Sequence, residues 1–189
     1  MRKRGVCGFL LSLAVVFNLL GTPLAARAES TEQVAVSTLL ELKNALADEA
    51  VQTVVVKGTI DISGEAIDGG GKTIQVEKPG RTDTGAIRAD RSVYSVFTNH
   101  TTASLSNATV MGGGTTAIKN DGVMTLDQVV VTGVYADRDH GGALYNTGKM
   151  YVKNSLFKNN AADAGGAFYN NQATALLVME DSSCVENIA

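Results

Sequence analysis

The sequence predicts an all-β fold, a parallel β-solenoid preceded by a single amphipathic helix. Three observations support this prediction. Short segments that end in Asn recur about every 24 residues, apolar and polar residues alternate within them, and Gly is frequent (20 of 189 residues) while Pro is rare (2). Alternation with a period of two is typical of β-strands. A repeat of this length with several short strands is typical of one solenoid coil.

The chain begins with a segment that has the form of a secretory signal peptide. Residues 1–4 are Met followed by three basic residues, residues 6–20 are an apolar run, and Ala26-Arg27-Ala28 is a small-residue cleavage signal. The apolar run is shorter than the roughly 20 residues that a membrane-spanning helix needs. We therefore expect cleavage after Ala28, export of the remaining chain, and no membrane span in the mature protein.

Removal of residues 1–28 changes the charge and the cysteine content. The formal net charge is −3 for the whole chain, and the removed segment holds four basic and no acidic residues, so 161 residues remain with a charge of −7. An acidic chain disfavours nucleic acid as a partner. Only Cys184 remains of the two cysteines, so no intrachain disulfide is expected.

Residues 29–50 are expected to form a linker and a capping helix, and residues 38–50 are the helical part. Thr38 and Glu41 have the spacing of a capping box, in which each side chain bonds to the other residue's backbone amide. Four apolar residues fall on one helical face: Leu39, Leu42, Leu46 and Ala50. Residues 51–62 then read as the first strand, and we assign residues 51–189 to the solenoid coils.

Two landmarks define the repeat. The first is the Asn that ends four similar segments, at spacings of 21, 26 and 24 residues: Asn99, Asn120, Asn146 and Asn170. The second is an inward apolar position that follows each Asn: Val110, Val131, Phe157 and Cys184. The last spacing is longer and implies a three-residue insertion. A leucine-rich repeat is the alternative at this length, but it requires Leu at fixed positions and a helical half, which the sequence lacks.

The repeated Asn has two physical uses in a solenoid. Asn tolerates the left-handed conformation of a tight corner, and stacked Asn side chains can form a hydrogen-bonded ladder from coil to coil. Glycosylation is the alternative, because Asn99-His100-Thr101 and Asn107-Ala108-Thr109 match the acceptor pattern, but it accounts for only one of the four ladder positions. We expect Cys184 to be a buried small hydrophobic residue, and His100 to be exposed without a functional partner.

Two segments resemble a known repeat family. Gly141-Gly142-Ala143 and Gly165-Gly166-Ala167 resemble the glycine-pair motif of the polymorphic outer membrane protein repeat, and Phe157-Lys158-Asn159-Asn160 resembles its companion motif. Residues 67–74 are similar to the opening coils of many right-handed β-helix proteins, and the amphipathic helix resembles their N-terminal cap. The pattern departs from the family where Tyr94-Ser95 and Thr115-Thr116 replace the glycine pair and where Cys184 replaces Phe.

The resemblance implies a right-handed, single-stranded parallel β-helix and an exported protein of the bacterial cell surface or outer membrane, or a secreted one. Proteins with these repeats are typically surface-displayed passengers of autotransporters, and several are adhesins. The partner would then be a surface protein or glycan of a host or neighbouring cell. Residues 181–189 align with residues 154–162, so a further coil beyond Ala189 is expected and we interpret the chain as truncated. The alternative is a last coil covered by a partner or by dimerisation.

Acid/base groups in the sequence would indicate an enzyme, because β-helices also host polysaccharide lyases and hydrolases. The candidates lie in Asp137-Arg138-Asp139-His140 and at Asp163. Carboxylates and an imidazole could perform acid/base chemistry or bind calcium weakly, and an enzyme would require Asp137, Asp139 and Asp163 to converge in one groove. A charged, solvated turn is the simpler interpretation. We therefore expect a non-enzymatic surface protein without a cofactor, with a polysaccharide enzyme and a structural stalk as alternatives.

Overall fold

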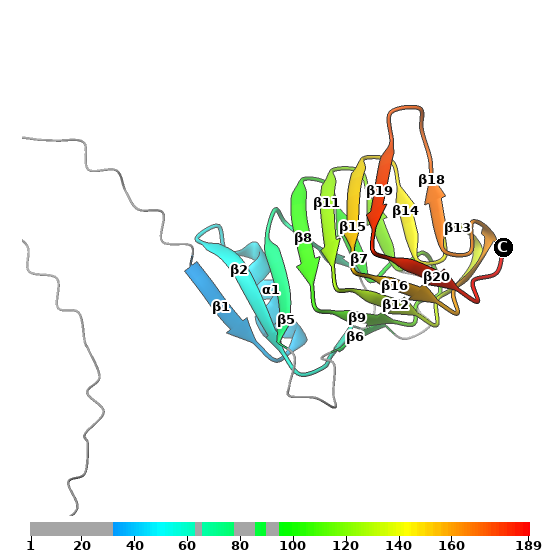
Figure 1. Ribbon diagram of the computed structural model, residues 1–189. Helices are drawn as coiled ribbons and strands as arrows, with labels where there is room; N and C mark the ends of the chain where they lie inside the picture. Colours follow the sequence, from blue (N-terminus) through cyan, green and yellow to red (C-terminus); the bar gives the residue numbers. More distant parts are fainter. Residues whose placement is uncertain (1–31, 63–65, 78–85, 90–94) are drawn as a thin grey trace, which may run out of the picture. The chain divides into compact units, whose positions relative to one another are not determined.

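The computed structural model describes residues 32–62, 66–77, 86–89 and 95–189 (Figure 1). The predicted signal peptide and its cleavage site at Ala28 lie outside these residues. The described part is mostly β-strand, with one helix, and every strand pairing in it is parallel. The predicted all-β class with parallel strands is therefore confirmed.

The strands form three large sheets and one small one, here named A to D. Sheet A contains β1 (Glu32–Val36), β2 (Val51–Lys57), β5 (Thr73–Glu77), β8 (Thr102–Ser106), β11 (Val123–Asp127), β15 (Lys149–Lys153) and β19 (Leu176–Glu180). Sheet B contains β3 (Ile60–Ile62), β6 (Ala86–Ala89), β9 (Thr109–Met111), β12 (Val130–Thr132), β16 (Leu156–Lys158) and β20 (Ser183–Val185). Sheet C contains β4 (Ile67–Asp68), β7 (Phe97–Asn99), β10 (Ile118–Asn120), β14 (Leu144–Asn146) and β18 (Phe168–Asn170), and sheet D pairs β13 (Tyr135–His140) with β17 (Ala161–Ala164).

From β2 onward the chain visits sheets A, B and C in rotation, and we call one such passage a circuit. Each strand pairs with its counterpart in the next circuit, for example β8 with β11 and β11 with β15. In Figure 1 the strands of sheet A lie side by side in this order. Strands in a sheet are about 4.8 Å apart, so that is the rise from one circuit to the next.

The predicted alternation places one side of each strand in the core. Met124 and Leu126 of β11 are buried, and they pair in register with Met150 and Val152 of β15, which are buried too. The second predicted landmark is also in register, since Val131 pairs with Val110 on one side and with Phe157 on the other. Burial of one such side chain contributes about 1.5–3 kcal/mol, and these columns form a single apolar core.

The predicted capping box is present at the start of α1 (Leu39–Ala47). The Glu41 amide donates to the Thr38 hydroxyl at 3.2 Å, and the Glu41 carboxylate accepts from the Thr38 amide at 3.1 Å. Hydrogen bonds to the Glu41 carboxylate from the Ser37 amide and hydroxyl, together with that from the Thr38 amide, hold the pKa of Glu41 below its ordinary value. The helix ends three residues before the predicted Ala50, which is exposed, and Leu42 and Ala45 supply its buried face.

Strand β1 was not predicted, because residues before the helix were assigned to a linker. Val34 and Val36 of β1 pair in register with Val54 and Val56 of β2. Val36 is buried at 2% exposure, so β1 extends sheet A and adds to the core. The buried Lys72 ties the end of α1 to the sheets, since its ammonium group donates to the Asp48 carbonyl at 2.8 Å.

The four repeated Asn residues form the predicted ladder, although they do not form corners. Each ends a strand of sheet C, and none is among the described residues with positive φ. The amide of each donates to the side-chain oxygen of the next, at 2.8, 2.7 and 2.7 Å along Asn99, Asn120, Asn146 and Asn170. The prediction of left-handed corners at these positions is wrong, because each Asn keeps the extended conformation of the strand that it ends.

The two glycine pairs meet two different backbone requirements. Gly141 and Gly165 have φ of 72° and 64°, and a Cβ there would collide with the carbonyl of the residue three positions later. A Cβ on Gly142 would collide with the Gly166 carbonyl of the next circuit. In each pair the first glycine permits the turn, and the second permits close stacking of the circuits.

Candidate functional site

Two of the predicted carboxylates lie together on sheet D. Asp137 is on β13 and Asp163 is on β17, and both line a shallow hollow of about 230 Å³. The hollow is otherwise lined by Tyr135 and three alanines. Both carboxylates are exposed, and two exposed carboxylates with apolar neighbours form a weak site for either catalysis or a cation.

Asp139 does not join them. The β13–β17 register shifts between Ala136 and His140, and the Asp139 carboxylate instead lies 3.0 Å from the Lys119 ammonium of β10. It also accepts from the His140 amide at 2.9 Å. Burial raises the pKa of Asp139, but hydrogen bonds from the His140 amide and the Lys119 ammonium outweigh it and hold that pKa below its ordinary value. Asp139 therefore does not line the hollow with Asp137 and Asp163, although a polysaccharide enzyme would require the three carboxylates to converge.

His140 packs on an aromatic side chain. Its exposed ring lies edge-on to Tyr169, with ring centroids 4.6 Å apart and planes at 66°. Its backbone carbonyl accepts from the Thr116 hydroxyl at 2.7 Å. Among the described residues, no group of three or more His, Cys, Asp or Glu side chains is close enough to hold a metal ion.

His100 has a partner that the sequence analysis did not identify. Its Nδ1 lies 2.7 Å from the Asp121 carboxylate, and the two residues follow Asn99 and Asn120 at equivalent places in neighbouring circuits. The hydrogen bond to Asp121, aided by the charge of that carboxylate, raises the pKa of His100. Both side chains are exposed, so solvent screens the pair.

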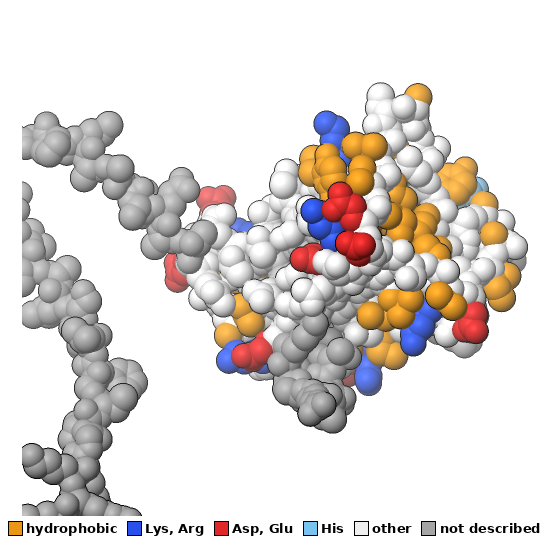
Figure 2. Space-filling view, in the orientation of Figure 1, with side chains coloured by type: hydrophobic (Ala, Val, Ile, Leu, Met, Phe, Trp, Pro, Cys, Tyr) orange, Lys and Arg blue, Asp and Glu red, His pale blue; other side chains and the backbone are white. Residues whose placement is uncertain are grey.

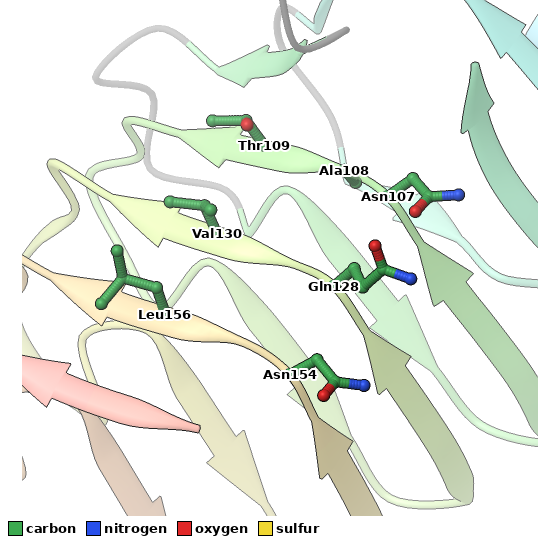
Figure 3. Close-up of a pocket in the computed structure, with 7 residues that line it drawn as sticks. All are labelled: Asn107, Ala108, Thr109, Gln128, Val130, Asn154 and Leu156. Carbon is green, nitrogen blue, oxygen red and sulfur yellow. The ribbon is translucent and has the colours of Figure 1, made fainter. Parts of the chain in front are cut away.

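A groove of about 520 Å³ lies where the strands of sheet A turn into those of sheet B (Figure 3). Figure 3 shows a column of three amide side chains at the turn, one from each of three circuits, beside a row from the outer face of sheet B. The amides are Asn107, Gln128 and Asn154, and the row is Thr109, Val130 and Leu156. Ala108 completes the lining.

One column of left-handed corners lies at this groove. Asn107, Gln128 and Asn154 have φ of 57°, 56° and 50°, a conformation in which amide and acidic residues are the usual non-glycine occupants. Asp181 continues the series with a φ of 47°. The sequence carries a signal for these corners, since an amide or acidic residue directly follows β8, β11, β15 and β19. The corners were instead predicted at the Asn residues of the ladder.

The side chains of the groove are suited to hydrogen bonding with a polar ligand. Amide side chains both donate and accept hydrogen bonds, and here they recur once per circuit, next to the apolar Val130 and Leu156. The Asn154 amide also donates to the Asp127 carboxylate at 2.9 Å, which orients it. None of the seven lining residues titrates near neutral pH. The groove can therefore hold a polar ligand, but it supplies no general acid or base.

Cys184 occupies the predicted register, opposite Phe157, but its predicted burial is wrong. The thiol is free and exposed, because β20 is the edge strand of sheet B in the described structure. The part of the side chain that packs on the preceding circuit is shielded from solvent, which raises the pKa of the thiol.

The outer face of sheet A carries paired charges. Figure 2 shows Lys and acidic side chains together on this face, next to an apolar area. Ion pairs cross neighbouring strands at Lys57–Glu77 (3.6 Å) and Lys153–Glu180 (3.2 Å). Such exposed pairs contribute little stability, and they distribute both signs of charge over the sheet.

Within the part of the chain that the structure describes, no helix has the length and apolar character needed to cross a membrane. Comparison of the chain with known protein families, with curated proteins and with solved structures finds no match.

Proposed function

We propose that the parallel sheets form a right-handed, single-stranded parallel β-helix, with α1 and β1 at its N-terminal end. The rotation of the chain through sheets A, B and C supports this proposal, because each circuit then corresponds to one coil. The in-register Asn ladder supports it as well. Connections between neighbouring parallel strands of a sheet are right-handed in about 98% of cases, which favours the right-handed form.

We further propose that the protein is a non-enzymatic, exported surface protein that contacts host or neighbouring cells. Adhesins and autotransporter passengers have this function, and the glycine-pair repeats of this chain are similar to repeats found in such proteins. The observation that carries the proposal is the corner groove, since it offers a hydrogen-bonding amide in each of three circuits and no acid or base. The signal-peptide pattern of residues 1–28 supports export.

A polysaccharide lyase or hydrolase is the less favoured alternative. A hydrolase requires two carboxyl groups that flank one glycosidic bond, whereas Asp139 pairs with Lys119 and leaves Asp137 and Asp163 in a separate shallow hollow. A structural stalk is the remaining alternative, and it predicts a surface without a ligand.

Attachment of beads to cells tests the proposed contact function. Beads coated with the exported protein should adhere to cultured epithelial cells or to bacterial cells. Leu156→Lys, which places a charge in the groove, should reduce that adhesion, whereas Val123→Lys on the outer face of sheet A is the matched control. If coated beads adhere no better than bare beads, the contact function is wrong and the stalk is favoured. If both variants adhere like the wild-type protein, the groove is not the contact site.

Export is tested separately by N-terminal sequencing. The chain carrying a C-terminal tag should be recovered outside the cytoplasm of a bacterial host, with Glu29 as its first residue. Recovery of the uncleaved chain in the cytoplasm would contradict the proposed route.

A further inference from the structure

The outer face of sheet C carries a second polar hollow, distinct from the corner groove. Its volume is about 200 Å³, and it lies across β7, β10 and β14 at the ends of these strands. The side chains that matter to its chemistry are Thr98, His100, Lys119, Asp121, Tyr145 and Thr147. No role was predicted for this set of residues. Its members on neighbouring strands are separated by 21 or 26 residues along the chain and meet only through the strand register.

Tyr145 forms one wall of the hollow and is held in a fixed orientation. On the side of β18, the Tyr169 ring lies nearly parallel to it, with ring centroids 5.7 Å apart and planes at 12°. The Tyr145 hydroxyl accepts a hydrogen bond of 2.7 Å from the Asn171 amide. Since β10 is the other neighbour of β14 in the sheet, the opposite face of the Tyr145 ring is turned toward the hollow.

The charged groups of the hollow each have a partner. The Lys119 ammonium lies 3.0 Å from the Asp139 carboxylate, which is not part of the lining, and His100 lies 2.7 Å from the Asp121 carboxylate. The charges of these groups balance when His100 is protonated, and the hollow retains many hydrogen-bonding atoms. The hydroxyls of Thr98 and Thr147 and the proton of the Tyr145 hydroxyl add donors and acceptors.

We propose that this hollow binds a neutral pyranose unit of a glycan. A pyranose has an apolar C–H face that packs on an aromatic ring, and its hydroxyls both donate and accept, as the paired groups around it require. The ring is held in place before binding, so little conformational entropy is lost. The proposal rests on the proposed contact function and adds to it a second binding position, separate from the corner groove, with the class of its ligand.

Size and charge favour a neutral sugar over a drug-sized molecule, a protein partner or an acidic sugar. Drug-sized ligands occupy pockets of about 300–1,000 Å³, so this hollow suits one sugar ring of a longer chain. A stable protein partner buries about 1,200–2,000 Å² in total around an apolar centre, which this small polar hollow does not provide. An acidic sugar would be repelled by the formal charge of −7 that the mature chain carries after cleavage at Ala28.

Calorimetric titration of the exported chain tests the proposal. The probes are cellotetraose and chitotetraose as neutral glycans, and tetragalacturonate as the acidic one. At least one neutral probe should bind, and tetragalacturonate should bind at least tenfold more weakly. Tyr145→Ala should weaken that binding at least tenfold, Tyr145→Phe should retain most of it, and Tyr151→Ala should leave it unchanged. Tyr151 is the matched control, since it is an outward Tyr on sheet A, in the circuit that follows the one containing Tyr145.

The outcomes separate this proposal from the contact function. Circular dichroism and thermal melting first establish that each variant is folded. If no neutral probe binds, or if Tyr145→Ala binds like the wild-type protein, the sugar site is wrong. Bead adhesion that persists in that case leaves the contact function intact. If Tyr145→Ala abolishes adhesion but periodate oxidation of the glycans on the target cells leaves adhesion unchanged, the ligand is not a glycan and the glycan proposal is overturned.

Discussion

At the scale of single residues, the two Asn columns show what a sequence pattern can and cannot specify. Asn favours both left-handed corners and stacked ladders, so the repeat of Asn99 and Asn120 was assigned both uses. Burial separates the two uses, since the ladder residues Asn99, Asn120 and Asn146 are almost fully buried, whereas the corner residues Asn107 and Asn154 are not. A sequence without its register does not reveal which column faces the interior.

The Asn ladder should contribute strongly to stability. Asn120 donates to Asn146 and accepts from Asn99, and all three are buried. Asn120→Ala removes the donor to the buried Asn146 side-chain oxygen and to two backbone carbonyls, as well as one of the three acceptors of the Asn99 amide, and a buried polar group left without a partner costs about 1–3 kcal/mol. We expect the free energy of unfolding in urea to fall by about 2–4 kcal/mol, against little change for Asn44→Ala on the exposed face of α1. Equal effects of the two variants would contradict a structural role for the ladder.

The His100–Asp121 pair should give a measurable pH dependence. Because Asp121 raises the pKa of His100 in the folded state, the pair stabilises the fold fully below the unfolded value of about 6.5. This stabilisation is lost as the pH rises through the folded pKa, and it is small since both groups are exposed. NMR titration should show one imidazole with a pKa above 6.5, returning toward 6.5 in Asp121→Asn. With only two His residues in the chain, His140→Gln assigns the signals. An unchanged titration in Asp121→Asn would exclude the pair.

At the scale of elements, the equivalent parts of the circuits were predictable and their differences were not. The landmarks at Asn146 and Phe157 pair as the spacing predicts, including the three-residue insertion before Cys184. The circuits that span 26 and 24 residues contain the extra strands β13 and β17, which pair with each other to form sheet D. A register shift within that pair directs Asp139 away from Asp137, and nothing in residue spacing indicates such a shift.

The tight turn at the first glycine of each pair can be tested by comparing two glycines. Gly141 and Gly133 both have φ near 70°, but a Cβ on Gly133 would meet no atom, whereas on Gly141 it would collide with the Leu144 carbonyl. Gly133→Ala should therefore cost only the left-handed strain, about 1–2 kcal/mol. Gly141→Ala should cost about 2–5 kcal/mol, since overpacking adds about 1–3 kcal/mol. The measurement is urea unfolding of both variants, and costs of the same size would show that the carbonyl contact is not limiting.

At the scale of the whole molecule, stability comes from each circuit covering the next. Leu126 and Val152 in inner circuits are buried, whereas Leu177 and Met179 of β19 are only partly buried against the same core. Cys184 is exposed at a position where Phe157, one circuit earlier, is fully buried. The inward pattern of a strand therefore predicts the direction of a side chain, while its burial depends on whether another circuit lies over it.

The Phe157 column provides the test at this scale. Phe157→Ala should cost about 3–5 kcal/mol, because it opens a cavity beneath two neighbouring circuits, whereas Cys184→Ala, in the same column, should change stability by less than about 0.5 kcal/mol. If circuits are held mainly by their nearest neighbours, Phe157→Ala should accelerate amide hydrogen exchange first in β12, β16 and β20. The amides of β2, which lie several circuits away, should retain their protection. Equal acceleration in β2 and β16 would mean that the described circuits open as one cooperative unit.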